Sequence, residues 1–277
     1  MNTKMKKIQI IALLSLALIF MNACKKDDES KVSVKLTDDP FPIGMASAAN
    51  IGIAKIELKN SDGNYVTVFN GNANVNMLNY TNGATAEVTV NTVPEGTYVE
   101  AKIYLNSASV ELSDGRNFDA EVSASHSHTV SINPAVEVGA NDTGELLIDM
   151  DLSDSFNFQV SGMGGWISDV MDIMGLSSFN PDFRAVNLSQ TGSIEGSVTD
   201  ANGNSVAYAY VHISYDYNGD GNPDTVSTIC DEHGHYAIIG IPEGNYTVVA
   251  ETSNNSGLTT GVQVSVQHNV AANVTIN

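Results

Sequence analysis

The sequence predicts an all-β protein made of two β-sandwich domains. Short apolar stretches with a period of two residues recur along the chain, and this is the spacing of strands that bury one face. Clusters of Gly, Asn and Asp separate these stretches and favour tight turns. The alternation becomes more regular near residue 191, so we expect two domains, residues 32–190 and residues 191–277.

Strands of the first domain follow from this alternation. They are expected at Val32–Leu36, Ile51–Leu58, Tyr65–Phe69, Ala86–Thr92, Tyr98–Leu105, Ser109–Leu112, His128–Asn133, Gly144–Asp151 and Arg184–Leu188. Such a series suits a β-sandwich or a barrel with alternating inner faces. Before the last strand, Trp166, Val170, Ile173 and Met174 lie on one face of a helix, which predicts a short amphipathic helix. This helix would either cap the open end of the sandwich or contact a partner.

The second domain shows the same strand pattern in a shorter segment. Its strands are expected at Ile194–Val198, Val211–Tyr215, Tyr236–Ile239, Tyr246–Glu251, Val262–Val266 and Val270–Ile276. The length suits a seven-stranded immunoglobulin-like module.

Local motifs in both segments resemble known families. In the first, Val34–Pro40, Val93–Tyr98, Leu147–Leu152 and Asn180–Val186 resemble a domain of unknown function found at the N-terminus of many bacterial surface lipoproteins. In the second, Gly192–Asp200, Asp231–Tyr236 and Ile241–Val248 are similar to the carboxypeptidase regulatory-like family of prealbumin-type sandwiches. That family implies a non-catalytic spacer, an adhesion unit or a module that contacts sugars.

Residues 1–23 have the pattern of a secretory signal peptide. Lys4, Lys6 and Lys7 precede an uncharged run at 8–20, which predicts a helical signal segment too short to span a bilayer comfortably. Ala23-Cys24 closes this run and resembles the lipobox of bacterial lipoproteins. The resemblance implies that Cys24 carries fatty acyl chains and becomes the mature N-terminus. The alternative is an ordinary cleaved signal that a chance cysteine follows.

Residues 24–31 form a charged tether after the signal. Lys26, Asp27 and Asp28 resemble the lysine-plus-acid signal that sends lipoproteins to the outer face of the outer membrane in one Gram-negative group. We therefore expect a protein anchored in the outer membrane and exposed at the cell surface. The composition is also that of a solvated, disorder-prone tether.

Charge and cysteine content restrict the partners. Three of the 12 basic residues and none of the 32 acidic ones lie in residues 1–23, so the remainder has 9 basic and 32 acidic side chains, a formal charge of −23. This excess argues against nucleic acid as a partner and favours divalent cations. With Cys24 acylated, Cys230 is the remaining thiol, and we interpret it as a buried apolar residue.

One loop of the second domain has the spacing of a calcium site. Oxygen-bearing side chains stand at positions 1, 3, 5 and 9 of the loop, a glycine stands at position 6, and position 7 offers a carbonyl; the predicted ligands are Asp216, Asn218, Asp220, Asn222 and Asp224. The loop resembles those of dockerin and thrombospondin-type repeats, although position 12 lacks the bidentate glutamate. The alternative is an acidic hairpin tip without an ion.

Catalytic motifs are absent from the sequence. It contains no G-x-S-x-G elbow, H-E-x-x-H motif or glycine-rich phosphate loop. The histidine pairs 126/128 and 233/235 lack a third ligand at metal spacing and are interpreted as surface residues. Asp149 and Asp151 share one strand face and are interpreted as a solvated pair. We expect no enzyme.

The function expected from these features is a lipid-anchored surface protein with a non-catalytic binding, adhesion or structural role. Its partners would be the membrane, through the lipid, and a glycan or another surface protein. One alternative is a carbohydrate-binding accessory lipoprotein of a glycan-uptake system. The other is a fimbria-like assembly subunit, which would need an exposed edge strand.

Overall fold

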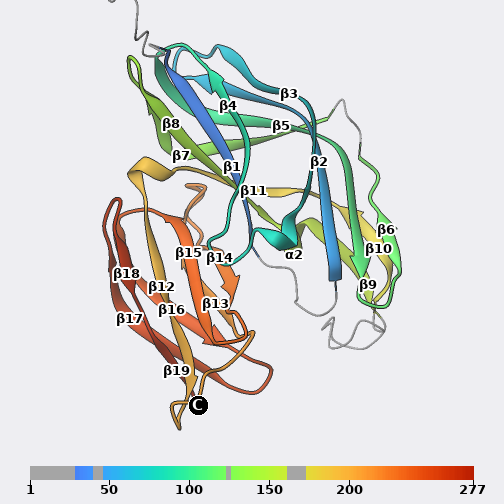
Figure 1. Ribbon diagram of the computed structural model, residues 1–277, viewed down its shortest axis with the longest axis vertical. Coiled ribbons are helices and arrows are strands. Elements are labelled where there is room, and N and C mark those ends of the chain that lie inside the picture. The colour runs from blue at the N-terminus through green and yellow to red at the C-terminus, as the bar shows by residue number, and fades with distance from the viewer. Residues whose placement is uncertain (1–28, 40–45, 123–125, 161–172) are drawn as a thin grey trace, which may run out of the picture.

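The computed structural model describes residues 29–39, 46–122, 126–160 and 173–277, and nearly all of its regular structure is strand (Figure 1). The prediction of an all-β fold is confirmed. Strands before residue 188 and strands after residue 191 belong to different sheets, so the described chain forms a first and a second sandwich. The predicted signal helix lies outside the described residues.

The first sandwich contains eleven described strands. They are β1 (Lys31–Asp39), β2 (Ala46–Asn60), β3 (Tyr65–Asn76), β4 (Ala86–Thr92), β5 (Gly96–Leu112), β6 (Asn117–Asp119), β7 (Ser127–Val138), β8 (Thr143–Asp151), β9 (Phe156–Val160), β10 (Ile173–Phe179) and β11 (Asp182–Asn187). Three short helices join them: η2 (Met77–Asn79), α2 (Leu152–Ser155) and η4 (Leu188–Gln190). Nine strands form one sheet with the order β3-β2-β5-β7-β11-β8-β1-β4, in which β6 pairs with β5, while β9 and β10 form a separate hairpin.

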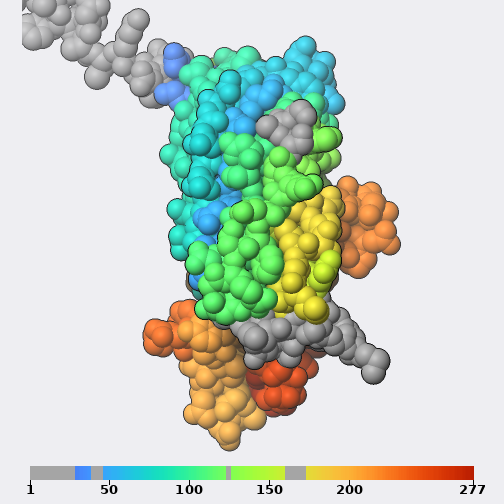
Figure 2. Space-filling model, turned by 90° about the vertical axis from the view of Figure 1, so that its right-hand side faces the viewer, coloured from blue at the N-terminus to red at the C-terminus, as the bar shows by residue number. Residues whose placement is uncertain are grey.

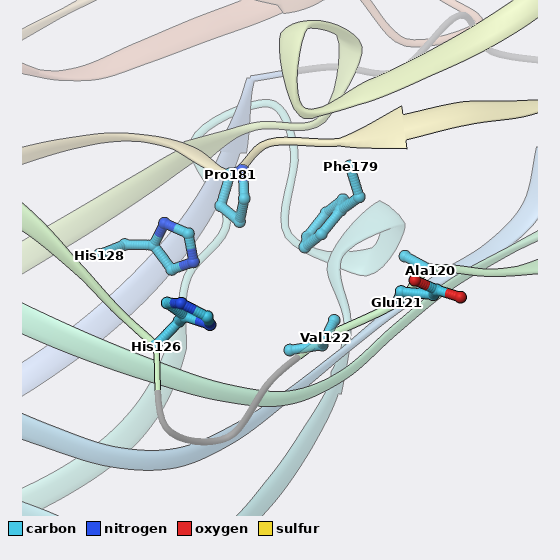
Figure 3. A pocket seen from close by; sticks show the side chains of 7 residues that line it. All are labelled: Ala120, Glu121, Val122, His126, His128, Phe179 and Pro181. Atoms are coloured by element: carbon cyan, nitrogen blue, oxygen red, sulfur yellow. The ribbon is translucent and has the colours of Figure 1, made fainter.

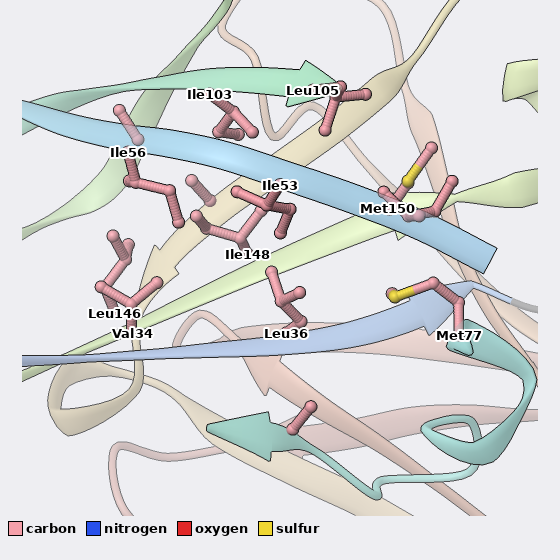
Figure 4. Close-up of a cluster of buried hydrophobic side chains, with 14 of the residues drawn as sticks. Val34, Leu36, Ile53, Ile56, Met77, Ile103, Leu105, Leu146, Ile148 and Met150 are labelled. Atoms are coloured by element: carbon pink, nitrogen blue, oxygen red, sulfur yellow. The ribbon is translucent and has the colours of Figure 1, made fainter. Parts of the chain in front are cut away.

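This sheet folds over until its two end strands meet. Thr89 Oγ1 and Asn91 Nδ2 on β4 both donate to the carbonyl of Val68 on β3, at 3.3 and 2.9 Å. The two halves of the sheet enclose one apolar core, in which side chains such as Leu36, Ile53, Ile103 and Ile148 meet (Figure 4).

A β-bulge in β2 keeps that core continuous along a long strand. Ile51 and Ile53 are buried at odd positions, whereas Ile56 and Leu58 are buried at even positions. The register of β2 with β3 and β5 shifts between Ile53 and Lys55, and one extra residue there moves the alternation by one position. All four side chains therefore face inward.

The second sandwich consists of two four-stranded sheets. Its strands are β12 (Gly192–Asp200), β13 (Tyr210–Tyr215), β14 (Asp224–Ile229), β15 (His235–Ile241), β16 (Gly244–Glu251), β17 (Ser256–Val264), β18 (Asn269–Ala271) and β19 (Val274–Ile276). One sheet has the order β15-β12-β18, with β19 also on β12, and the other has the order β14-β13-β16-β17. Because β18 and β19 are two parts of one interrupted strand beside β12, the predicted seven-stranded module is confirmed.

A glycine explains that interruption. The backbone at Ala272 crosses so close to Gly196 that an added Cβ would lie 1.9 Å from the Ala272 carbonyl oxygen. Only glycine leaves room for this approach, and the ladder between β12 and the last strand breaks there.

Several local expectations need correction. The two strands expected at 98–105 and 109–112 are one continuous strand, β5, and strands β6, β9 and β10 were not expected. Most of the amphipathic helix expected around Trp166 lies outside the described residues, but Ile173 and Met174 begin strand β10, so this part of the prediction is wrong. Cys230 is buried and has a free thiol, as expected, and burial raises the pKa of its thiol.

The same tyrosine contact anchors one hairpin in each sandwich. The sequences Pro94–Tyr98 and Pro242–Tyr246 both read P-E-G-x-Y. In both, the tyrosine hydroxyl donates to the proline carbonyl four residues earlier, at 2.8 Å. This contact resembles the tyrosine corner of immunoglobulin-like sandwiches.

Candidate functional site

The two sandwiches meet end to end at a polar contact, which we call the junction. The first sandwich contributes the ends of β1, β8 and β11 and the turn between η2 and β4, and the second contributes β13, β14 and β15. The space-filling view shows an orange part of the second sandwich beside the yellow strands of the first (Figure 2).

Arg184 is the central residue of the junction. It lies opposite Asp149 in the β11–β8 pairing, and its Nη2 atom is 2.6 Å from Asp149 Oδ2, with Nε at 3.2 Å. The side chains are only 5% and 8% exposed. A buried carboxylate and guanidinium need each other, because an unpaired charge there carries the full desolvation cost.

The remaining hydrogens of Arg184 reach into the second sandwich. Nη1 donates to the carbonyl of Gly240 at 2.7 Å and to the hydroxyl of Tyr215 at 3.2 Å. Nη2 donates to the carbonyl of Ile239 at 3.3 Å. Burial raises the pKa of Tyr215, so this hydroxyl stays protonated at neutral pH. One side chain of the first sandwich thus satisfies two backbone groups at the edge of β15.

Asn82 completes the coverage of that edge. Its Oδ1 atom accepts from the amide of Ala237 at 2.6 Å, and its Nδ2 atom donates to the carbonyl of His235 at 3.3 Å. The side-chain amide therefore pairs with β15 as a neighbouring peptide group would. Asn82 has a φ of 55°, a left-handed conformation that Asn adopts more readily than most residues. Edge strands in native proteins are commonly covered in this way against unwanted pairing.

Further carboxylates lie near the Arg184–Asp149 ion pair. Burial, followed by the charges of Asp154 and Asp149, raises the pKa of Asp151 to about 6, although hydrogen bonds from Asp154 N and Ser153 Oγ oppose the shift. Burial and the charge of Asp154 also raise the pKa of Asp182. The interpretation of Asp149 and Asp151 as a solvated pair is therefore wrong, because the second sandwich covers the end of β8 and Arg184 pairs with Asp149.

The loop expected to bind calcium lies at the tip of the β13–β14 hairpin, next to the junction. The carboxylate of Asp216 accepts three loop amides, from Gly219, Asp220 and Gly221, at 2.6–3.1 Å. Asn218 Oδ1 accepts from Asp220 N, and Asp220 Oδ1 accepts from Asn222 N.

The last predicted ligand of that loop contacts one of the others. Asp224 is the first residue of β14 and accepts from Tyr217 N and Asn218 Nδ2, both at 3.2 Å. Among the residues that the structure describes, no three His, Cys, Asp or Glu side chains are grouped so as to hold a metal ion. The spacing thus organises the turn around Asp216 without bringing the three aspartates together.

The N-terminal site residues cannot be placed in the fold. Cys24, Lys26, Asp27 and Asp28 lie outside the described residues. Within the described ranges, no helix is both long enough and apolar enough to cross a membrane.

A cavity of about 690 Å³ opens at the end of the first sandwich (Figure 3). It is lined by Ala120, Glu121, Val122, His126, His128, Phe179 and Pro181. The histidines lie on one side with Pro181 next to His128, and Phe179 lies across from the histidines. Burial, helped by the charge of His126, lowers the pKa of His128, so this imidazole is neutral at pH 7. The sequence did not indicate this cavity, because its walls combine residues between 120 and 128 with Phe179 and Pro181, which are far away in the sequence.

Family comparison gives the domain composition. Residues 29–167, half of the 277-residue chain, match the family described as Domain of unknown function (DUF4382). The chain belongs to this family. Residues 193–277 match the family described as Carboxypeptidase regulatory-like domain. Both resemblances expected from the sequence are confirmed as domains.

Comparison with individual proteins adds little. No curated protein matches the chain. Matching structures include the Bacillus anthracis TIE protein (13% identity, TM-score 0.24), the Bacillus cereus major pilin subunit BcpA (13%, 0.24) and a streptococcal ancillary pilin (11%, 0.25). Each match covers 89% of this chain, and 34%, 99% and 62% of the other chain, respectively. The chain thus spans about a third of the TIE protein, and all three TM-scores are below 0.5.

Proposed function

We propose that this chain is a lipid-anchored protein of the outer membrane, exposed at the cell surface, with a non-catalytic binding, adhesion or structural role. Acyl chains on Cys24 would hold it in the membrane, and residues 24–28 would form the tether. The tether ends earlier than the expected residue 31, because Ser30 is buried with its hydroxyl on the Gly139 carbonyl and Lys31 already begins β1. Residues 32–190 and 191–277 would then be two domains outside the membrane, and the second would present its loops to a glycan or a surface protein.

The direction of β1 is the observation that carries this proposal. Lys31 begins the strand beside the β7–β8 turn, where its amide donates to the Asp142 carbonyl at 2.8 Å, whereas Thr37 near its end lines the junction. The nine residues of β1 span roughly 30 Å at about 3.3 Å per residue. A tether before Lys31 would therefore leave one end of the first sandwich, while the second sandwich projects from the other (Figure 1).

The two cysteines give a matched test of the anchor. We expect Cys24→Ser to move the protein from the membrane fraction to the soluble fraction, and Cys230→Ser to leave it in the membrane, since that thiol is buried in the second sandwich. Mass spectrometry of the N-terminal peptide from native cells should find acyl chains on Cys24. An unmodified cysteine in membrane-bound protein would refute the proposal.

The export signal needs a separate test. Asn substitution of both Asp27 and Asp28 removes the acidic part of the proposed signal and leaves Cys24 unchanged. We expect this variant to stay membrane-bound but to resist protease added to intact cells, while Glu29→Gln remains sensitive. Equal sensitivity of the two variants would contradict surface export through these residues.

Calcium at the β13–β14 loop is a further part of the proposal. Support comes from the EF-hand-like spacing of Asp216, Asn218 and Asp220 and from the positive φ angles of Gly219 and Gly221, which permit the sharp turn. Binding would require the carboxylates of Asp216, Asp220 and Asp224 to come together, since the structure does not group them. Extracellular sites of this kind bind with Kd values of about 10⁻⁴–10⁻³ M. We expect millimolar calcium to raise the melting temperature of the protein but not that of the Asp216→Asn variant. Equal melting temperatures of the unchanged protein in calcium and in chelator would contradict calcium binding at this loop.

The fimbria-like alternative requires a strand edge that a partner strand could pair with. In the described part of the second sandwich, Asn82 and Arg184 cover β15. Thr259 Oγ1 on β17 donates to the carbonyl of Asn273, the residue before β19, at 2.6 Å. Assembly by strand addition would first have to displace these contacts. If the chain does assemble in this way, a chemical crosslinker added to cells should give a ladder of oligomers, which a surface monomer would lack.

A further inference from the structure

The cavity at the end of the first sandwich is a ligand site that the anchoring proposal does not use. We propose that it binds a neutral sugar residue of a glycan. Its volume of about 690 Å³ is within the usual range of small-molecule sites, roughly 300–1,000 Å³. The inference does not depend on the lipid anchor, because it rests on the walls of the cavity alone.

One wall offers a flat apolar surface. Phe179 is half-buried, and its ring packs on that of Phe156, with centroids 4.7 Å apart, so its orientation is fixed. Pro181 stands beside it, and Val122 extends the apolar surface below (Figure 3). A sugar ring has apolar faces made of C–H groups, and such a face packs well on a fixed aromatic ring.

The other wall offers polar groups that suit hydroxyls. A neutral imidazole has one N–H donor and one nitrogen acceptor, and a carboxylate accepts only. His128, which is neutral, therefore presents both kinds of group to the cavity, and His126 lies beside it, whereas Glu121 lies across the cavity next to Ala120 (Figure 3). A sugar hydroxyl both donates and accepts, so it can pair with each of them. A wholly apolar ligand would leave these groups without partners and is disfavoured.

Charge disfavours ionic ligands. Among the described residues that line the cavity there is no Lys or Arg, and Glu121 adds a negative charge to a strongly acidic protein, which disfavours phosphates and uronic acids. A cationic amine would gain little, because the carboxylate of Glu121 is exposed and its attraction is screened by solvent and salt. A neutral sugar fits the remaining combination.

The histidines provide the probe for the test. The chain has six histidines, and two of them line the cavity. Side-chain nitrogen NMR of the purified protein would be recorded during titration with neutral hexoses and their disaccharides, with a uronic acid and a diamine as comparison arms. We expect the signals of His126 and His128 to shift with a neutral sugar, while the other four histidines stay unchanged.

Variants separate binding from folding. Phe179→Ala and Phe179→Leu both remove the ring, but the leucine keeps most of the packing on Phe156, and we expect both to weaken sugar binding about tenfold. His126→Ala should weaken binding too, while the exposed His233→Ala in the second sandwich should not. The proposal is overturned if no neutral sugar moves His126 and His128, if only the uronic acid or the diamine does, or if Phe179→Leu binds like the unchanged protein.

Discussion

Arg184 is the residue at which the two sandwiches exchange the most hydrogen bonds. Its guanidinium pairs with Asp149 within the first sandwich and reaches two carbonyls and one hydroxyl of the second. The ion pair is buried, so its Coulombic attraction largely offsets the cost of removing two charges from water. We infer that its main effect is to fix how the two sandwiches meet, because the guanidinium bonds to groups of both.

Removal of one partner should be far more damaging than removal of both. Arg184→Met leaves Asp149 as an uncompensated buried charge, and we expect it to lower the free energy of unfolding by about 3–5 kcal/mol. The double variant with Asp149→Leu should recover most of this loss. Urea unfolding of the unchanged protein and the two variants provides the comparison, and a double variant no more stable than the single one would contradict this account.

Asp151 should make stability depend on pH. Its pKa rises from 3.8 to about 6 on folding, so the folded state binds this proton more tightly than the unfolded state does. The free energy of unfolding should therefore fall as pH rises from about 4 to about 6, and remain at the lower value above that range. Asp182, whose pKa is also raised, adds to the same trend.

Asp151→Asn tests this dependence with little change in geometry. The asparagine oxygen can still accept from the amide of Asp154 at the start of α2. We expect the variant to be more stable than the unchanged protein near pH 7 and to lose part of the decline between pH 4 and pH 6, measured as melting temperature against pH. Parallel curves for the two proteins would assign the decline to other groups.

The sequence could not have shown this residue cluster. Period-two alternation correctly placed Asp149 and Asp151 on one face of a strand, but alternation does not tell what covers that face. Their partner, Arg184, is more than thirty residues away and was assigned only to a strand. Residues of the cavity were missed for the same reason, since Phe179 is far from Val122 and His128 in the sequence.

At the scale of elements, most strands could be predicted, because burial of one face leaves a direct trace in the sequence. The exceptions have physical causes. β5 was divided because the exposed polar residues Asn106 and Ser107 resemble a turn, yet the pairing with β2 continues past them. β14 was missed because its first residue, Asp224, was assigned to a metal loop, although it pairs with Tyr215 at the start of the ladder.

The repeated P-E-G-x-Y corners allow a comparison within one chain. Tyr98 is fully buried, and Tyr246 is 9% exposed; both donate their hydroxyl to a proline carbonyl. Loss of one buried hydrogen bond costs about 1 kcal/mol or somewhat more. We expect Tyr98→Phe and Tyr246→Phe each to lower stability by about that amount in thermal unfolding, while Tyr208→Phe, which is 56% exposed, has little effect. A stable Tyr98→Phe variant would show that the corner is a consequence of the hairpin and not a support for it.

At the scale of the whole molecule, the junction decides whether the sandwiches move as one body. The edge strand β15 of the second sandwich is covered at the junction, because Asn82 and Arg184 pair with its backbone from His235 to Gly240. Gly240 contributes as well, since an added Cβ would come within 2.9 Å of Leu147 and Val186 of the first sandwich. The contact is therefore close as well as polar, and we expect little independent swinging.

Asn82→Gly tests that expectation without backbone strain, because glycine accepts the positive φ of this position. The change removes both hydrogen bonds to β15, so the amide of Ala237 loses its acceptor. We expect the hydrogen exchange of that amide to become at least about tenfold faster, and small-angle scattering to show a broader range of overall dimensions.

Asn141→Gly is the matched control, since Asn141 has a φ of 57° in the β7–β8 turn, at the opposite end of the first sandwich. If both variants leave the Ala237 amide equally protected, the edge of β15 is held by packing and by Arg184, and the side-chain amide of Asn82 does not hold the sandwiches together.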